Sequence, residues 1–185
     1  MPMLELNEVL LRGEERTLSL MGEAGQMTCL VGGTRRRRQR WLMAMLGFED
    51  VQVGYISVDG EPLNRKNVGV LRAMMGYVPD GLRKEGEVVT YEPPTVQDVF
   101  QLRANRHLPI SNGMLAEEMR RTGLPADEAR WLAVAVLLER PILLVDHPSA
   151  GAANYLHYQA RRGRTVIVAT DETSVYGSAD KVIEI

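Results

Sequence analysis

Two glycines followed by a run of arginines form the most conspicuous chemical feature of this 185-residue chain. The segment reads Gly32, Gly33, Thr34, Arg35, Arg36, Arg37, Arg38 and Gln39, and Arg40 extends the run. It follows the apolar residues 27–31 and precedes apolar residues at helical spacing, which predicts a strand, a loop and a helix. Guanidinium groups at the N-terminus of a helix suit anions, because unpaired backbone N–H groups there carry partial positive charge.

Three hypotheses fit the arginine run. It is a solvated helix start with no binding role, as most charge runs are. Alternatively, it binds an acidic protein surface or a phosphate-bearing ligand, or it contacts nucleic acid. The nucleic-acid hypothesis is disfavoured, because the formal net charge of the chain is -2 and there is little aromatic support near the run.

Other polar residues stand at the ends of predicted strands. Asp80, the pair Asp146-His147, and Asp171 each follow a short apolar run. His147 has no second His, Cys or carboxylate at metal-ligand spacing other than Asp146, so no metal site is predicted.

The predicted elements alternate between strands and helices. Strands are predicted at 4–11, 17–21, 27–31, 55–58, 76–79, 142–145, 165–169 and 182–185. Helices are predicted at 36–46, 68–75, 95–103, 114–122, 126–138 and 152–162. This order predicts one α/β domain with a mainly parallel sheet, entered by an antiparallel edge.

The composition, 45% hydrophobic and 25% charged, is that of an ordinary globular protein and excludes a disordered or fibrous chain. The single cysteine, Cys29, lies in an apolar run and is predicted to be a buried small side chain, which fits a reducing compartment. There is no export signal and no apolar run of roughly 18 residues, so neither export by that route nor insertion into a membrane is expected.

The order of the segments resembles the ATPase domain of ABC transporters over essentially the whole chain. The resemblance rests on framework strings at Met3 to Leu6, Leu18 to Leu20, Gly25 to Met27, Leu30 to Gly32, Val53 to Gly60, Met75 to Pro79, Thr95 to Val99, Leu143 to Pro148, Gly163 to Thr170 and, like a closing hairpin, Ala179 to Val182. It implies a P-loop NTPase-like ABC ATPase fold for residues 1–185, with a mainly parallel core sheet and antiparallel edge hairpins. Residues 81–140 would form a reduced helical subdomain.

The residues that would bind phosphate depart from the family pattern. The pattern G-x-x-x-x-G-K-[ST] closes backbone N–H groups around phosphates, brings a lysine to them and ligates magnesium through a hydroxyl. In the register that begins at Gly32, Arg37 replaces the second glycine, Arg38 the lysine and Gln39 the hydroxyl residue. Arg38 keeps the charge as a planar fork rather than a compact point charge.

The remaining family positions have also changed. Asp80 stands at the Q-loop glutamine, His147 at the catalytic glutamate and Asp171 at the H-loop histidine, while Asp146 is of the expected type. The signature corresponds at best to Leu124 to Glu128, and the aromatic residue on which adenine would stack is missing near residues 11–13. A general base contributes about 10²- to 10⁴-fold in rate, so the loss of the base and the phosphate contacts together predicts no turnover.

The resemblance therefore implies a pseudo-ATPase without catalysis or cofactor, a structural or regulatory subunit of an ABC transporter-like or secretion-type membrane complex. Expected partners are a competent ABC ATPase or a second copy of the chain, together with a membrane subunit that docks on residues 80–105. The expected location is cytoplasmic, at the inner face of the membrane. Two alternatives are a divergent subunit that binds Mg-ATP and relies on a partner for hydrolysis, and a regulatory module that binds an anionic ligand through Arg35 to Arg38.

Overall fold

A parallel sheet forms the centre of the computed structural model, which describes residues 3–80 and 96–185. Its strands run in the order β6-β7-β8-β3-β9, and every neighbouring pair is parallel. The strands are β3 (Met27–Val31), β6 (Met75–Val78), β7 (Ile142–Asp146), β8 (Thr165–Ala169) and β9 (Lys181–Glu184). β7 and β8 are buried along their whole length, as expected of inner strands covered by helices on both faces.

A separate antiparallel sheet has the order β2-β1-β4-β5. Its strands are β1 (Leu4–Leu11), β2 (Leu18–Gly22), β4 (Val51–Val58) and β5 (Glu61–Pro62). The register of β1 against β4 shifts after Asn7, where Gly54 has a φ of +75°. A Cβ at Gly54 would lie 2.2 Å from the Asn7 carbonyl oxygen, so only glycine allows the two strands to pass there.

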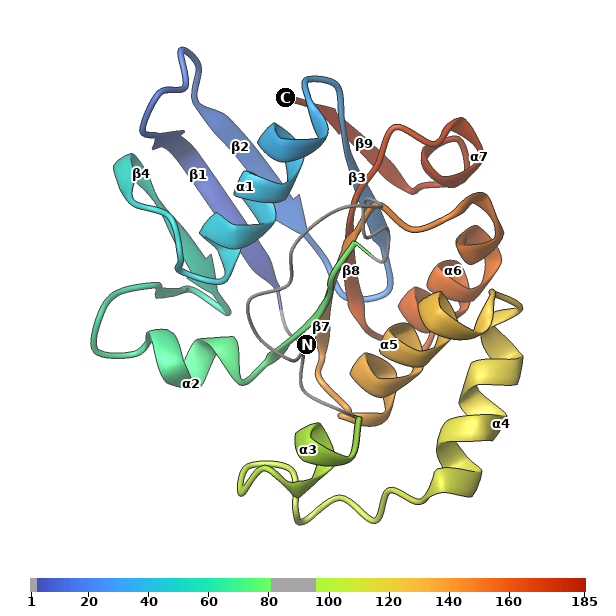
Figure 1. The fold of residues 1–185 in the computed structure, drawn as a ribbon. Helices are drawn as coiled ribbons and strands as arrows, with labels where there is room; N and C mark the ends of the chain where they lie inside the picture. Colours follow the sequence, from blue (N-terminus) through green and yellow to red (C-terminus); the bar gives the residue numbers. More distant parts are fainter. Residues whose placement is uncertain (1–2, 81–95) are drawn as a thin grey trace, which may run out of the picture.

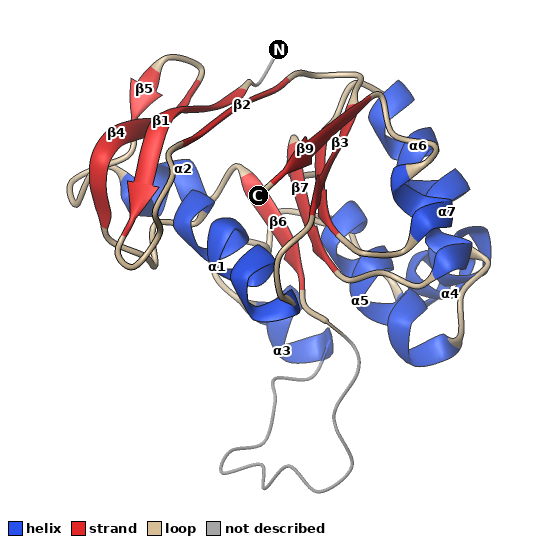
Figure 2. Cartoon of the chain, turned by 90° about the horizontal axis from the view of Figure 1, so that it is seen from above, coloured by secondary structure: helices blue, strands red, loops and turns tan. Residues whose placement is uncertain are grey.

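The helices lie on both sides of the parallel sheet (Figure 1). They are α1 (Arg35–Met45), α2 (Val68–Arg72), α3 (Val96–Gln101), α4 (Asn112–Thr122), α5 (Ala126–Leu137), the 3₁₀ turn η1 (Ala150–Ala152), α6 (Ala153–Arg161) and α7 (Thr173–Tyr176). Seen from above, α1 lies between the two sheets, while α5 and α6 cover the opposite face of the parallel sheet (Figure 2).

Each face of the parallel sheet has its own hydrophobic core. The first core joins the antiparallel sheet, α1 and one face of the parallel sheet, and includes Leu4, Trp41 and Leu144. The second joins the other face to α5 and α6, and includes Leu132 and Leu156. Complete burial of such side chains stabilises the fold by about 1.5–3 kcal/mol each, so the first core fixes α1 against the sheet from which the site residues project.

The α/β fold class predicted from the sequence is confirmed, and most predicted elements lie within a few residues of the observed ones. The helix predicted over 68–75 is wrong at its end, because residues 73–74 turn the chain into β6. The strand predicted over 55–58 is too short, because β4 continues back to Val51 along β1. Where the resemblance suggested a closing hairpin, β9 pairs with β3 as a parallel edge strand.

The chain between β6 and β7 contains α3, α4 and α5, and residues 81–95 of the predicted subdomain lie outside the described residues. α4 begins at the side-chain cap Ser111 and ends at Gly123, which has the left-handed conformation common after a helix. Among the residues that the structure describes, no helix is long and apolar enough to span a lipid bilayer.

Candidate functional site

The candidate residues gather at the carboxyl ends of the parallel strands. Gly32 and Gly33 follow β3, Asp80 follows β6, His147 follows β7 and Asp171 follows β8. In open α/β sheets, ligands bind beyond this edge of the sheet. The sequence interpretation therefore identified groups that the fold does bring together.

The connection between β3 and α1 is short. β3 ends at Val31 and α1 begins at Arg35, so only residues 32–34 lie between them. The phosphate-loop pattern would place four residues between its two glycines, and here Arg35 and Arg36, the last two of those four, are already helical. The Thr34 hydroxyl accepts a hydrogen bond from the backbone N–H of Arg37 at 3.2 Å. The capped helix thus takes up part of the backbone that a phosphate loop would leave open.

Arg38, at the lysine position of the pattern, folds back beneath this connection. Its side chain is 3% exposed, and Nη1 donates to the carbonyl oxygens of Gly32 at 2.8 Å and Gly33 at 3.0 Å. Nη2 donates to the carboxylate of Asp171 at 2.8 Å. Two backbone oxygens of the loop and one carboxylate therefore hold the guanidinium in place.

His147 links Arg38 to Asp146. Arg38 Nε lies 3.1 Å from His147 Nε2, and His147 Nδ1 lies 2.5 Å from Asp146 Oδ1. Because arginine can only donate, Nε2 is the acceptor, and Nδ1 carries the proton donated to Asp146. The result is a continuous chain of carboxylate, imidazole, guanidinium and carboxylate from Asp146 to Asp171.

The other carboxylate oxygen of Asp146 is also in use. Gln39 Nε2 donates to Asp146 Oδ2 at 2.9 Å, and the hydroxyl of Tyr77 donates to the same oxygen at 3.1 Å. Burial, and next the negative charge of Asp146, raise the pKa of Tyr77 well above its ordinary value. Asp146 therefore accepts bonds from Gln39, Tyr77 and His147, and the amide of Gln39 takes the place where the pattern puts a metal-binding hydroxyl.

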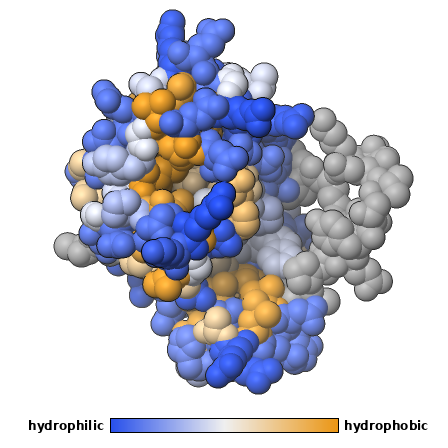
Figure 3. Space-filling view, turned by 90° about the vertical axis from the view of Figure 1, so that its left-hand side faces the viewer, coloured by the Kyte–Doolittle hydropathy of each residue, from blue (hydrophilic) through white to orange (hydrophobic). Residues whose placement is uncertain are grey.

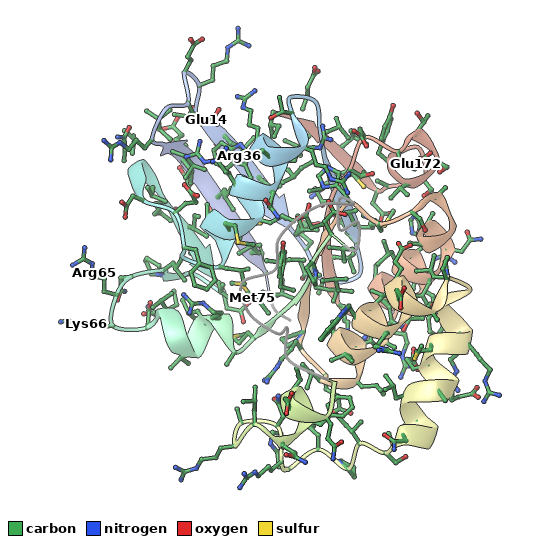
Figure 4. All side chains as sticks on the ribbon, viewed as in Figure 1. Glu14, Arg36, Arg65, Lys66, Met75 and Glu172 are labelled. Atoms are coloured by element: carbon green, nitrogen blue, oxygen red, sulfur yellow. The ribbon has the colours of Figure 1, made fainter. Side chains whose placement is uncertain are left out.

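Arg37, at the second glycine position, is tied to the β1–β2 connection. Its guanidinium pairs with Glu14 at 2.6 Å, and Arg40 lies 3.6 Å from the other oxygen of the same carboxylate. Glu14 has a side chain that is 6% exposed and lies beside α1 (Figure 4). Sequence reasoning did not single out Glu14, which belongs to no recognisable motif, and it included Tyr77 only within the framework string Met75 to Pro79.

The arginine run is therefore largely neutralised within the chain. Arg35 forms an ion pair with Asp80, and Arg40 also pairs with Glu49 at 3.0 Å. Arg36 is exposed and forms no ion pair with the described residues (Figure 4). Of the three hypotheses for the run, a solvated helix start describes the exposed Arg35 and Arg36, whereas Arg38 is buried and Arg37 and Arg40 are half-buried in ion pairs.

The segment matched to the signature forms the start of α5. Pro125 precedes the helix, and Asp127 and Glu128 lie in its first turn, where negative charge is favourable. The carboxylate of Glu128 accepts a hydrogen bond at 2.6 Å from the backbone N–H of Ser149, just after β7. This segment is thus fixed to its own chain.

The arrangement as it stands does not fit a phosphate group with magnesium. The guanidinium of Arg38 is bonded to the loop carbonyls of Gly32 and Gly33, and both oxygens of Asp146 accept bonds from protein donors. Within residues 3–80 and 96–185 no cluster of three or more His, Cys, Asp or Glu is placed to hold a metal ion.

Solved structures with the same fold include subunits and larger proteins of ABC transporters. An ATP-binding subunit of an ABC transporter superposes with a TM-score of 0.73 at 17% identity, over 99% of this chain and 85% of that one. CbiO1 of Clostridium perfringens, part of the ABC transporter complex cbiONQ, gives 0.71 at 19% identity, over 98% and 83%.

A bacterial Atm1-family ABC exporter with ATP bound gives a TM-score of 0.67 at 16% identity, over 100% of this chain and 37% of the exporter. No protein-family model matches the sequence, and no curated protein sequence matches it significantly. The structural similarity extends over the whole length of this chain, which has the fold of ABC transporter ATP-binding subunits.

Proposed function

We propose that this chain is a pseudo-ATPase that neither binds nor hydrolyses ATP and serves as a structural or regulatory subunit of an ABC transporter-like or secretion-type membrane complex. The observation that carries the proposal is the position of Arg38. Its guanidinium is bonded to the carbonyl oxygens of Gly32 and Gly33, to His147 and to Asp171, and so joins the loop to two other positions at which the family pattern has catalytic residues.

The contacts of Arg38 make its displacement unfavourable. A nucleotide would have to break hydrogen bonds of a buried, charged side chain, each worth about 1.5–3 kcal/mol. Magnesium would have to compete with Gln39, Tyr77 and His147 for the oxygens of Asp146. The cost of displacing Arg38 and the competition for Asp146 both favour a chain that does not bind nucleotide over a divergent subunit that binds Mg-ATP.

The ion pairs of the arginines favour this function over a regulatory module that binds an anion through Arg35 to Arg38. Arg35, Arg37 and Arg38 already have carboxylate partners in Asp80, Glu14 and Asp171. Arg36 remains, and one exposed arginine is a weak anion site.

The proposed partners are a competent ABC ATPase or a second copy of this chain, and a membrane subunit that holds the complex at the inner face of the membrane. Residues 80–105, part of a reduced helical subdomain at 81–140, are the proposed docking segment, of which 81–95 lie outside the described residues. The face formed by the antiparallel sheet and α2 carries apolar patches among charged side chains (Figure 3). Val70 of α2 and Phe48, between α1 and β4, are exposed. Exposed apolar patches suit a protein interface.

Calorimetry with Mg-ATP tests the proposal. The wild-type chain is expected to release no binding heat, whereas the triple variant Arg37→Gly, Arg38→Lys, Gln39→Ser, which rebuilds the pattern, is expected to gain binding at micromolar to millimolar Mg-ATP. Arg36→Gly is the matched control, because Arg36 lies in the same turn of α1 and contacts none of the groups named above. Micromolar, magnesium-dependent binding by the wild-type chain would refute the proposal.

A further inference from the structure

A cavity lies at the edge of the parallel sheet opposite the arginine run. Its volume is about 160 Å³, and its walls come from residues 108–110, α4, the C-terminal ends of α5 and α6, and Arg164 just before β8. Drug-sized ligands occupy pockets of about 300–1,000 Å³, so this cavity suits a smaller molecule.

Arg164 is a partly buried cation without a carboxylate partner among the described residues. One of its terminal nitrogens donates to Gln159 Oε1 and the other to the carbonyl oxygen of Val136 at 2.9 Å, and both acceptors are uncharged. Burial lowers the pKa of Arg164, and the positive charge of Arg162 adds to this effect, whereas Tyr155 and the charges of Glu118 and Glu139 oppose it. A partly desolvated guanidinium that is paired only with neutral oxygens favours an anion beside it.

Two further donors line the same cavity. Arg162 rests its guanidinium over the Tyr158 ring, 5.7 Å from the centroid, and forms no ion pair in the part of the chain that the structure describes. Gln159 is 1% exposed, and its Nε2 forms no hydrogen bond of normal geometry there, although the amide interacts with the nearby hydroxyl of Tyr155. The cavity thus has donors whose capacity the chain itself does not use.

The acidic residues of the cavity are placed differently. Glu118 accepts bonds from the hydroxyl of Tyr155 and from Arg121, so its charge is already compensated. Glu139 and Arg162 are both exposed to solvent, which screens both charges, so the partly buried Arg164 is the main cation of the cavity. The rest of the wall is aliphatic and includes Leu108, Ile110 and Met114.

We propose that this cavity binds a small aliphatic monocarboxylate, with its carboxylate on Arg164 and Arg162 and its hydrocarbon body against residues 108–110 and Met114. The two arginines supply charge-assisted hydrogen bonds, and Gln159 supplies a further amide donor. The apolar wall excludes strongly hydrated anions, because they would lose water without gaining contacts.

The test is a titration of the isotopically labelled full chain with 3-methylbutanoate, followed by NMR. Saturable shifts are expected at residues 108–118 and 159–164, and the neutral isostere 3-methylbutanamide is expected to bind at least about tenfold more weakly, because it cannot form the charge-assisted bonds. Arg162→Gln and Arg164→Gln should each weaken carboxylate binding by about fivefold or more. Arg120→Gln, which removes a solvent-exposed arginine of α4 that does not line the cavity, should leave binding unchanged.

Equal binding of acid and amide, no saturable shift with the acid, or unchanged binding in both cavity variants would overturn the proposal. Arg164 also supports α5 through Val136, so the fold of each variant is checked by circular dichroism. If Arg164→Gln does not fold, Arg162→Gln decides the matter, since Arg162 is exposed and its removal leaves the backbone contacts intact.

Discussion

Arg38 and His147 are direct hydrogen-bond partners, 3.1 Å apart, although 109 residues separate them in the sequence. In the register of the ABC ATPase pattern, one stands at the phosphate-binding lysine and the other at the catalytic glutamate. Arg38 donates and His147 accepts this hydrogen bond, so substitution of either residue leaves the other without its partner.

Removal of Arg38 should destabilise the fold. Arg38→Ala leaves two loop carbonyls, His147 Nε2 and Asp171 without their shared donor. Loss of a buried, charged hydrogen-bonding group is expected to lower the free energy of unfolding by about 2–4 kcal/mol, measured by urea denaturation.

Two controls define the origin of this effect. Asp171→Ala breaks only the outer ion pair, whose carboxylate is 73% exposed, and should change stability by less than about 1 kcal/mol. Arg36→Ala should be close to neutral. If Arg38→Ala is as mild as Arg36→Ala, the guanidinium is not held as described.

Glu14 should couple the β1–β2 connection to α1. Glu14→Gln removes the charge shared by Arg37 and Arg40 and is expected to cost about 1–3 kcal/mol of stability, because charge-assisted bonds to a buried carboxylate are lost. A double-mutant cycle with Arg37→Ala measures the coupling. Strictly additive effects would show that the pair contributes nothing to the folded state.

Much of the fold was accessible from the sequence, because β3, β7 and β8 are uninterrupted apolar runs and α1 and α5 have clear helical periodicity. α7 was not predicted, since a helix of four residues is too short to produce a periodic pattern. β9 was recognised as a strand, but its parallel pairing with β3 depends on distant residues.

The sequence predicted which residues belong to the candidate site, but it did not predict the hydrogen bonds between them. The sequence identified Arg38, His147 and Asp171 as altered positions and Asp146 as one of the expected type, since each stands at a fixed place in a pattern. It did not indicate that these four form one chain of hydrogen bonds, because that depends on χ angles and on the early start of α1 at Arg35.

Cys29 should make the fold sensitive to alkaline pH. Burial raises the pKa of its thiol to about 12 in the folded state, whereas the ordinary value is 9.0. The stabilisation is therefore complete below pH ~9 and is lost as the pH rises toward 12, because only the unfolded chain ionises the thiol in this range.

Between pH 9 and pH 10 the wild-type chain is expected to lose ~1 kcal/mol more stability than Cys29→Ala, a difference that two urea denaturation series measure. Below pH 8 the difference between the two proteins should be constant. Identical pH dependence of the two proteins above pH 9 would mean that the thiol ionises as readily in the folded chain as in the unfolded one.

Replacement of the catalytic position alone should not create an ATPase. In His147→Glu the new carboxylate would lie about 3 Å from the guanidinium of Arg38, as the imidazole does now, and would form an ion pair instead of activating water. Phosphate release from Mg-ATP is therefore expected to stay at background.

The informative comparison is a quadruple variant that adds His147→Glu to Arg37→Gly, Arg38→Lys and Gln39→Ser. Because the guanidinium is then gone, the new carboxylate is free to act as a base, and a positioned base contributes about 10²- to 10⁴-fold in rate. Turnover by His147→Glu alone would mean that Arg38 leaves the loop easily, and the proposed absence of nucleotide binding would fail with it.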